Sequence, residues 1–196
     1  MKSWKTSSRF MGVFLAVCAS IGLLASFSLL HETFQVYKNP DYVASCNINP
    51  IISCQSAMSA PESEVLGLPF ATFGVAGFTA LLVFSVLLAA GTTFRPWVWR
   101  AGLLAATAGF GSAAYLYVVS MTKLGSICPW CFTTWVATIA IFWGVVTHVL
   151  STSHLTIPKR CKRAARFWVE YAPMILVSLY VLLVFSILLR FQEALL

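Results

Sequence analysis

Charged side chains are scarce in this sequence of 196 residues. Asp, Glu, Lys and Arg together account for 10% of the chain, whereas 59% of it is hydrophobic. So few charges cannot cover the surface of a water-soluble globule of this size, which excludes an ordinary soluble domain. Membrane topology then explains the net charge of +7, and nothing in the sequence supports binding to nucleic acid.

Recognisable cofactor motifs are missing as well. The sequence contains no glycine-rich nucleotide fingerprint, no haem motif and no flavin fingerprint. Its histidines, His31, His148 and His154, are scattered singly and suggest no proton relay. We therefore expect neither a resident nucleotide nor a metal.

Long apolar runs are abundant. Five uncharged stretches each approach the roughly 20 residues that a membrane-spanning helix requires. They cover residues 10–30, 69–94, 101–122, 129–147 and 171–189. The sequence therefore predicts an all-α integral membrane protein in which residues 1–196 form a single membrane domain.

Basic residues are distributed unevenly among the connections. Ten of the 13 Lys and Arg residues lie before the first stretch, between the second and third, or between the fourth and fifth. The others are Lys38, Lys123 and Arg190. The positive-inside rule therefore places the N-terminus in the cytoplasm, and the C-terminus and residues 31–68 on the outer face.

The connection of residues 31–68 is the longest in the chain. It contains apolar residues such as Tyr42, Ile51 and Ile52, so disorder is a poor explanation for its length. We expect it to fold back over the outer mouth of the helices, with a short helical turn near residues 53–58.

Two features predict how the helices pack. The short connection of residues 123–127 makes the third and fourth helices antiparallel neighbours. In the third stretch Ala105, Gly109 and Ala113 recur at four-residue spacing, which favours close approach of helix backbones in lipid.

The six cysteines divide according to this topology. Cys18 falls in the first stretch and Cys161 in a cytoplasmic connection, where thiols normally stay reduced, so both are predicted to be unpaired. The remaining four fall on the outer side, where disulfides persist: Cys46, Cys54, Cys128 and Cys131. This segregation is the strongest functional signal in the sequence.

Cys128 and Cys131 belong to a Cys-Pro-Trp-Cys motif at the predicted start of the fourth helix. Pro129 suits the first helical position, and a helix N-terminus lowers the pKa of a nearby thiol. The spacing puts both sulfurs on one face, which predicts a reversible redox pair. Two alternatives remain. One is a structural disulfide, which would close almost no loop. The other is zinc bound by all four outer cysteines, despite the wide spacing of Cys46 and Cys54.

Cys46 and Cys54 form a second pair in the long connection. Taken alone, this pair is typical of an ordinary loop disulfide around the turn at residues 49–50. Thiol-disulfide exchange, however, needs an attacking thiolate within reach of the next disulfide. Its predicted position above the Cys-Pro-Trp-Cys motif therefore favours a two-stage relay.

A relay also needs a final electron acceptor or donor. Because cofactor motifs are missing, a lipid-soluble quinone in the bilayer is the natural candidate. Its head group would lie beside Cys131, one helical turn deeper than Cys128, in an apolar pocket. Six aromatic residues could line this pocket, although core packing is the alternative for each: Phe70, Phe73, Tyr115, Tyr117, Phe132 and Trp135.

Three segments carry a family resemblance: residues 45–54 (SCNINPIISC), 67–69 (GLP) and 127–135 (ICPWCFTTW). Together they resemble the bacterial vitamin K epoxide reductase family. The similarity extends over nearly the whole chain. It looks like the form without a fused thioredoxin-like domain, since the sequence ends soon after the fifth stretch.

The resemblance implies a four-helix transmembrane bundle around a quinone, with a peripheral fifth transmembrane helix and an outer loop capping the bundle. Cys46 would take electrons from a secreted or membrane-anchored thioredoxin-like partner. Cys54 would pass them to Cys128 through a transient disulfide, and Cys131 would face the quinone, either menaquinone or ubiquinone. The protein would thus re-oxidise its partner at a bacterial inner membrane and support disulfide formation in exported proteins.

The chain departs from the family pattern at two positions. Phe70 stands where family members often have an Asn that can hydrogen-bond a quinone carbonyl, and Ala60 stands where they tend to have Ser. Trp135 occupies a position where an aromatic residue is usual. Two other functions stay open: a membrane quinone or quinone-epoxide reductase working in the other direction, and a membrane protein with structural disulfides only.

Overall fold

The computed structural model describes residues 8–39, 41–49, 51–65, 67–152 and 162–195, and it is mostly helical. Within this part of the chain, five helices are long and apolar enough to cross a membrane, as predicted. They are α1 (Ser8–Lys38), α3 (Phe70–Ala89), α4 (Pro96–Val119), α5 (Pro129–Ser151) and α6 (Lys162–Leu195). The predicted free thiol of Cys161 lies outside the described residues.

The helices do not begin and end where the apolar stretches do. α1 continues to Lys38, past the predicted limit at residue 30, and α6 begins at Lys162, ahead of the limit at residue 171. A helix satisfies its own backbone hydrogen bonds, so it needs no apolar side chains to continue beyond the hydrocarbon layer. The second apolar stretch, by contrast, was predicted to continue to residue 94, which is beyond the end of its helix. α3 ends at Ala89, and Gly91, with a φ of +97°, turns the chain toward α4.

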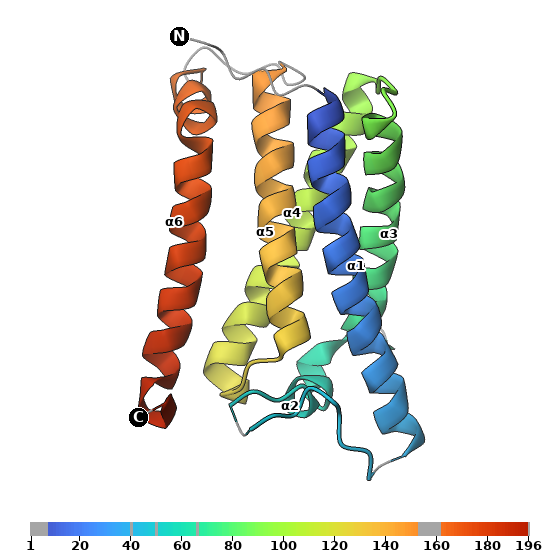
Figure 1. Ribbon diagram of the computed structural model, residues 1–196, viewed down its shortest axis with the longest axis vertical. Helices are drawn as coiled ribbons and strands as arrows, with labels where there is room; N and C mark the ends of the chain where they lie inside the picture. Colours follow the sequence, from blue (N-terminus) through green and yellow to red (C-terminus); the bar gives the residue numbers. More distant parts are fainter. Residues whose placement is uncertain (1–7, 40, 50, 66, 153–161, 196) are drawn as a thin grey trace.

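The helices pack side by side in the order that Figure 1 shows. α1 lies along both α3 and α5, and α4 packs against α5, so the predicted pairing of the third and fourth helices is confirmed. α6 stands at one edge, beside α5 (Figure 1).

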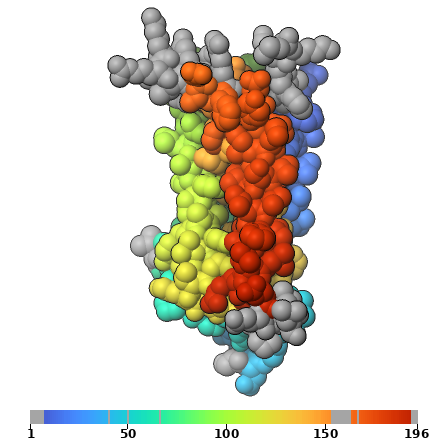
Figure 2. Space-filling view, turned by 90° about the vertical axis from the view of Figure 1, so that its left-hand side faces the viewer, coloured from blue at the N-terminus to red at the C-terminus, as the bar shows by residue number. Residues whose placement is uncertain are grey.

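Aromatic side chains attach α6 to the other helices. Trp143 of α5 stacks on Trp168 of α6 with ring centroids 3.9 Å apart, and its indole N–H donates to the carbonyl oxygen of Ala172 at 2.8 Å. Nearer the other end, the hydroxyl of Tyr117 in α4 contacts that of Ser186. α6 therefore lies over one face of the molecule, next to α4 (Figure 2).

The connection between α1 and α3 lies across one end of the helices, at the same end as the connection between α4 and α5 (Figure 1). It contains α2 (Gln55–Met58), where the sequence predicted a helical turn. A short turn η1 (Pro61–Ser63) and a hairpin of β1 (Glu64–Val65) and β2 (Leu68–Pro69) follow.

The far end of α4 is tied to this connection. α4 closes with a π-helical turn, η2 (Ser120–Leu124), which ends at Gly125 in the left-handed conformation. Lys123 in this turn forms an ion pair with Glu62 of η1. The pair holds the last turn of α4 beside the connection.

Glycine allows α1 and α3 to approach closely. A Cβ atom added to Gly12 would lie 2.8 Å from the Cα atom of Ala89, whereas one added to Gly111 of α4 would meet nothing within 4 Å. Side-chain motion cannot relieve a clash with backbone, so residue 12 has no room for a methyl group.

Gly12→Ala is therefore expected to lower the free energy of unfolding by about 1–3 kcal/mol, the usual cost of overpacking. Thermal unfolding of the purified protein in detergent measures this change. Gly111→Ala makes the same chemical change in open space and should be neutral or slightly stabilising. Equal thermal stability of the two variants would contradict the close approach of α1 and α3.

Candidate active site

Backbone pairing brings the long connection onto the segment that precedes α5. The N–H of Ile127 donates to the carbonyl of Ile51 at 2.7 Å, and the N–H of Ser53 donates to the carbonyl of Ile127 at 3.1 Å. Cys54 directly follows Ser53, and Cys128 directly follows Ile127. The pairing therefore puts these two cysteines next to each other, although 74 residues separate them in sequence.

Cys46, Cys54, Cys128 and Cys131 meet in one cluster. Cys46 and Cys54 are joined by a disulfide, while Cys128 and Cys131 are free thiols. The Sγ atom of Cys128 lies 3.1 Å from the Sγ atom of Cys54. A thiolate at this distance from a disulfide sulfur can attack it without any large movement of the chain. Cys18, by contrast, is a free thiol within α1, as predicted.

Exposure differs between the two ends of the loop disulfide. Cys54 is fully buried and Cys128 is 2% exposed, whereas Cys46 retains 7% of its surface. Cys46 is therefore the less buried end of the loop disulfide.

The start of α5 favours the thiolate of Cys128. Cys128 is the N-cap residue, Pro129 occupies the first helical position, and the Cys128 sulfur accepts the backbone N–H of Cys131 at 3.5 Å. The pKa of Cys128 is lowered, chiefly because the Cys131 thiol donates a hydrogen bond to its sulfur. Burial opposes this shift, and the backbone N–H groups of Cys131 and Trp130 support it. Since the thiolate is the nucleophile, Cys128 is suited to attack.

Asn47 holds Cys54 in place, a role that the sequence analysis missed. Its Oδ1 atom accepts hydrogen bonds from the hydroxyl of Ser53 (2.9 Å) and from the backbone N–H groups of Cys54 (3.0 Å) and Gln55 (3.2 Å). Its amide nitrogen donates to the side chain of Gln55 at 3.1 Å. Asn47 lies 7 residues ahead of Cys54, which is the N-cap residue of α2, so the usual capping pattern gave no signal for this role.

Asn47→Ala is expected to slow exchange between Cys54 and Cys128 by roughly 10-fold to 100-fold, because misplacing a reacting group by about 1 Å costs that much. The rate of crosslinking between these cysteines, followed by mass spectrometry in a Cys131→Ala background, measures it. Asn47→Asp keeps the acceptor oxygens and should retain most of the rate. If the Ala variant crosslinks as fast as its parent, Asn47 does not position Cys54.

Glu32 anchors the segment that carries Cys46. This carboxylate, 7% exposed at the end of α1, accepts hydrogen bonds from the hydroxyl and backbone N–H of Ser45 and from the hydroxyl of Tyr42. The pKa of Tyr42 is raised, because its hydroxyl donates a hydrogen bond to the carboxylate. The sequence analysis gave Glu32 no role, since its partners lie 10 and 13 residues away.

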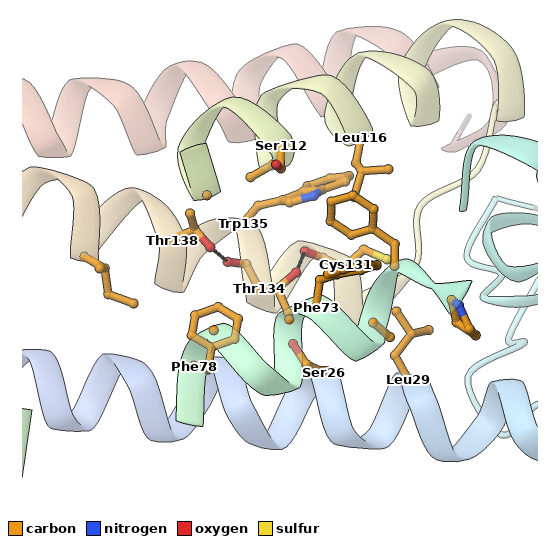
Figure 3. Close-up of a pocket in the computed structure, with 18 of the residues that line it drawn as sticks. Ser26, Leu29, Phe73, Phe78, Ser112, Leu116, Cys131, Thr134, Trp135 and Thr138 are labelled. Atoms are coloured by element: carbon orange, nitrogen blue, oxygen red, sulfur yellow. Dashed lines mark hydrogen bonds between the residues drawn. The ribbon is translucent and has the colours of Figure 1, made fainter. Parts of the chain in front are cut away.

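A cavity of about 630 Å³ extends from the cysteines into the space between the helices (Figure 3). Residues of α1, α3, α4 and α5 line it, residues of the long connection border it, and no described residue of α6 does so. Cys128 and Cys131 both reach it. Its lining is largely apolar, which suits a flat, hydrophobic ring system.

Only some of the predicted aromatic residues line the cavity. Phe70, Phe73 and Trp135 line the cavity. Tyr115 and Phe132 do not, so their predicted place in the pocket is corrected: Tyr115 is 54% exposed on the outside of α4, and Phe132 is rotated away from the face of α5 that carries Cys131. Tyr117 also lies outside the lining, packed edge-on against Trp135 with ring centroids 5.4 Å apart.

The small residues of α4 border the cavity and do not bring two helix backbones close together. Ala105, Gly109 and Ala113 all line the cavity. A Cβ atom added to Gly109 would approach no atom closer than Cγ2 of Thr138, at 3.9 Å. The predicted close backbone approach at these residues is therefore wrong.

Metal ligands do not gather in the part of the chain that the structure describes. There, no group of three or more His, Cys, Asp or Glu side chains is arranged to hold a metal ion. The zinc alternative required four thiolates, but Cys46 and Cys54 are joined in a disulfide and provide none.

Comparison with known proteins adds a family relationship. The sequence model of the vitamin K epoxide reductase family matches residues 13–146. The matched segment contains all four clustered cysteines and the cavity-lining parts of the four helices. A search among curated proteins finds no match to the chain.

Proposed function

Because the chain is a member of the vitamin K epoxide reductase family, a family of membrane oxidoreductases, we propose that it is a quinone-coupled thiol oxidoreductase. It takes electrons from a thioredoxin-like partner and delivers them to a quinone of the membrane. The observation that carries the proposal is the 3.1 Å separation between the sulfurs of Cys54 and Cys128, at the edge of an apolar cavity.

The reduced partner first opens the loop disulfide at Cys46, its less buried end. A partner thiolate attacks Cys46, which releases Cys54 as a thiolate, and the second partner thiol then resolves the mixed disulfide. The partner leaves as a disulfide, and Cys46 and Cys54 become a dithiol that holds two electrons.

Electrons then pass inward between the two cysteine pairs. The Cys54 thiolate attacks Cys128 in the disulfide between Cys128 and Cys131, so the Cys54–Cys128 bond forms and Cys131 leaves as a thiolate. Cys46 next attacks Cys54, which reforms the loop disulfide and frees Cys128. The described structure corresponds to this last state, with the loop pair oxidised and Cys128 and Cys131 reduced.

The last step occurs in the cavity. Cys128 and Cys131 become a disulfide again, and their two electrons and two protons convert the quinone to the quinol. Phe70, Phe73 and Trp135 hold the head group by contact with its faces and edges. α1, α3, α4 and α5 form the bundle around it, with α6 at the periphery.

The membrane topology determines the side of the membrane on which this reaction occurs. The basic connections lie in the cytoplasm of a bacterial cell, so the cysteines and the long connection face outward across the inner membrane. Disulfides persist in that compartment. The reaction then supports disulfide formation in exported proteins.

Purified protein in detergent tests the proposal, with a reduced thioredoxin-like oxidoreductase as electron donor and a short-chain menaquinone or ubiquinone as acceptor. We expect the quinone to be reduced at the rate at which the partner's thiols disappear, with one quinone consumed per dithiol. Faster reduction of an oxidised partner by quinol would instead show a reductase. Absence of both reactions would leave the disulfides with a structural role.

A further inference from the structure

Ser26 places an unpaired hydroxyl on the wall of the cavity. It lies on α1, it is 2% exposed, and it belongs to the cavity lining. Figure 3 shows its oxygen pointing away from α1, toward Phe73 and Thr134. Among the described residues this hydroxyl has no hydrogen-bond partner.

Other hydroxyls around the cavity are already satisfied. Ser112, Thr134 and Thr138 each donate to a backbone carbonyl of their own helix, at distances between 2.7 and 2.9 Å. Leaving a buried polar group unpaired costs about 1–3 kcal/mol, so such groups are rare in proteins. The free donor of Ser26 therefore calls for an acceptor that enters the cavity.

The neighbouring helix leaves space for this hydroxyl. Gly74 of α3 faces it, and a Cβ atom at residue 74 would lie 2.7 Å from the Ser26 oxygen. With glycine there, α3 passes Ser26 without a side chain, and the hydroxyl stays open to the cavity.

A second donor lies across the cavity on another helix. Trp135 of α5 is 3% exposed and lines the cavity, and its indole N–H has no hydrogen-bond partner among the described residues. Ser26 and Trp135 thus project from different helices into one apolar space (Figure 3). A para-quinone carries two carbonyl oxygens on opposite edges of its ring, which matches donors on different walls.

We propose that the Ser26 hydroxyl donates a hydrogen bond to one carbonyl oxygen of the quinone head group. This inference rests on the proposed quinone-coupled function and assigns a polar anchor on α1, where Phe70 can offer none. It makes Ser26 a binding residue that also orients the ring relative to Cys131.

Two measurements on Ser26→Ala test the proposal. The first is steady-state quinone reduction, in which we expect the KM for a short-chain menaquinone to rise by roughly 3-fold to 10-fold, the usual effect of one lost hydrogen bond. The second is the infrared carbonyl band of the bound quinone, which should move to higher frequency when the donor is removed. Ser20→Ala is the matched control, because Ser20 donates to Ala16 of the same helix and lies outside the cavity lining.

The outcomes separate this inference from the proposed function. If the unaltered protein reduces quinone and Ser26→Ala shows the same KM and the same carbonyl band, Ser26 is not the anchor, while the function stands. A raised KM without a shift of the band overturns the direct hydrogen bond. If the unaltered protein neither binds nor reduces quinone, the proposed function and this inference both fall.

Discussion

Cys131→Ala is expected to accumulate a disulfide between Cys54 and Cys128. The two sulfurs already lie 3.1 Å apart, so the Cys128 thiolate can attack the loop disulfide at Cys54 and release Cys46. In the proposed relay Cys131 resolves this bond, and the variant has no thiol at that position. The variant also loses the donor that lowers the pKa of Cys128, so incubation at about pH 8.5 restores enough thiolate.

Mass spectrometry of peptides from alkylated protein measures the Cys54–Cys128 bond. Cys46 can still reverse the reaction in Cys131→Ala, so only part of the protein should be crosslinked. Adding Cys46→Ser removes this second resolving thiol together with the loop disulfide, so the crosslink must then form by oxidation of the Cys54 and Cys128 thiols; with diamide as the added oxidant, it should become nearly complete. Cys18→Ala in the same background controls for pairing with the remaining thiol of α1. Full alkylation of Cys54 and Cys128 in the double variant would rule out the relay.

Cys54→Ser should abolish electron transfer from the partner to quinone. Cys54 is the loop sulfur in contact with Cys128, and it is fully buried, so no other thiol of the cluster can take its place. A hydroxyl does not form disulfides, so we expect a loss on the order of 1000-fold or more, as for other covalent catalytic residues.

A quinone-binding measurement separates this effect from misfolding. Cys54→Ser leaves the cavity lining unchanged, so quenching of tryptophan fluorescence by added quinone should match that of the unaltered protein. Turnover that persists in Cys54→Ser would mean that the partner reaches Cys128 directly. The loop pair would then be a structural disulfide.

Local features of the sequence predicted the position of the Cys-Pro-Trp-Cys motif well. The Cys-Pro-Trp-Cys motif starts α5 as expected, with Pro129 at its first position, because capping and proline preferences act over a few residues. The helical turn at α2 followed from similar reasoning. The number of helices followed from length and hydropathy alone.

The sequence could not predict contacts between segments that lie far apart in the chain. The hydrogen bonds of residues 51–53 with Ile127, and the contact of Glu32 with Ser45, involve polar groups that occur in any loop. Nothing in their own neighbourhood indicates the partner. The role of Asn47 was hidden for a similar reason, because the N–H groups that it binds lie 7 and 8 residues further along the chain.

The errors over Tyr115 and Phe132 have another cause. A helix surrounded by lipid is apolar on all sides, so no boundary between polar and apolar faces shows which side turns toward the bundle. Trp135 and Phe132 are equally plausible from the sequence, and only packing against α4 distinguishes them. For the same reason, the sequence could not show whether the small residues of α4 face another helix or the cavity.

The contact between residues 51–53 and Ile127 has a consequence for biosynthesis. Cys46 and Cys54 are only 8 residues apart, so in the proposed topology they can pair as soon as the first connection has crossed the membrane. Cys128 follows after two further helices, and it reaches Cys54 only when those helices have assembled. Contacts across so long a separation form late. We therefore expect that a newly inserted chain holds its first two cysteines in a closed loop, and that its electron path to the membrane opens only once the whole bundle is built.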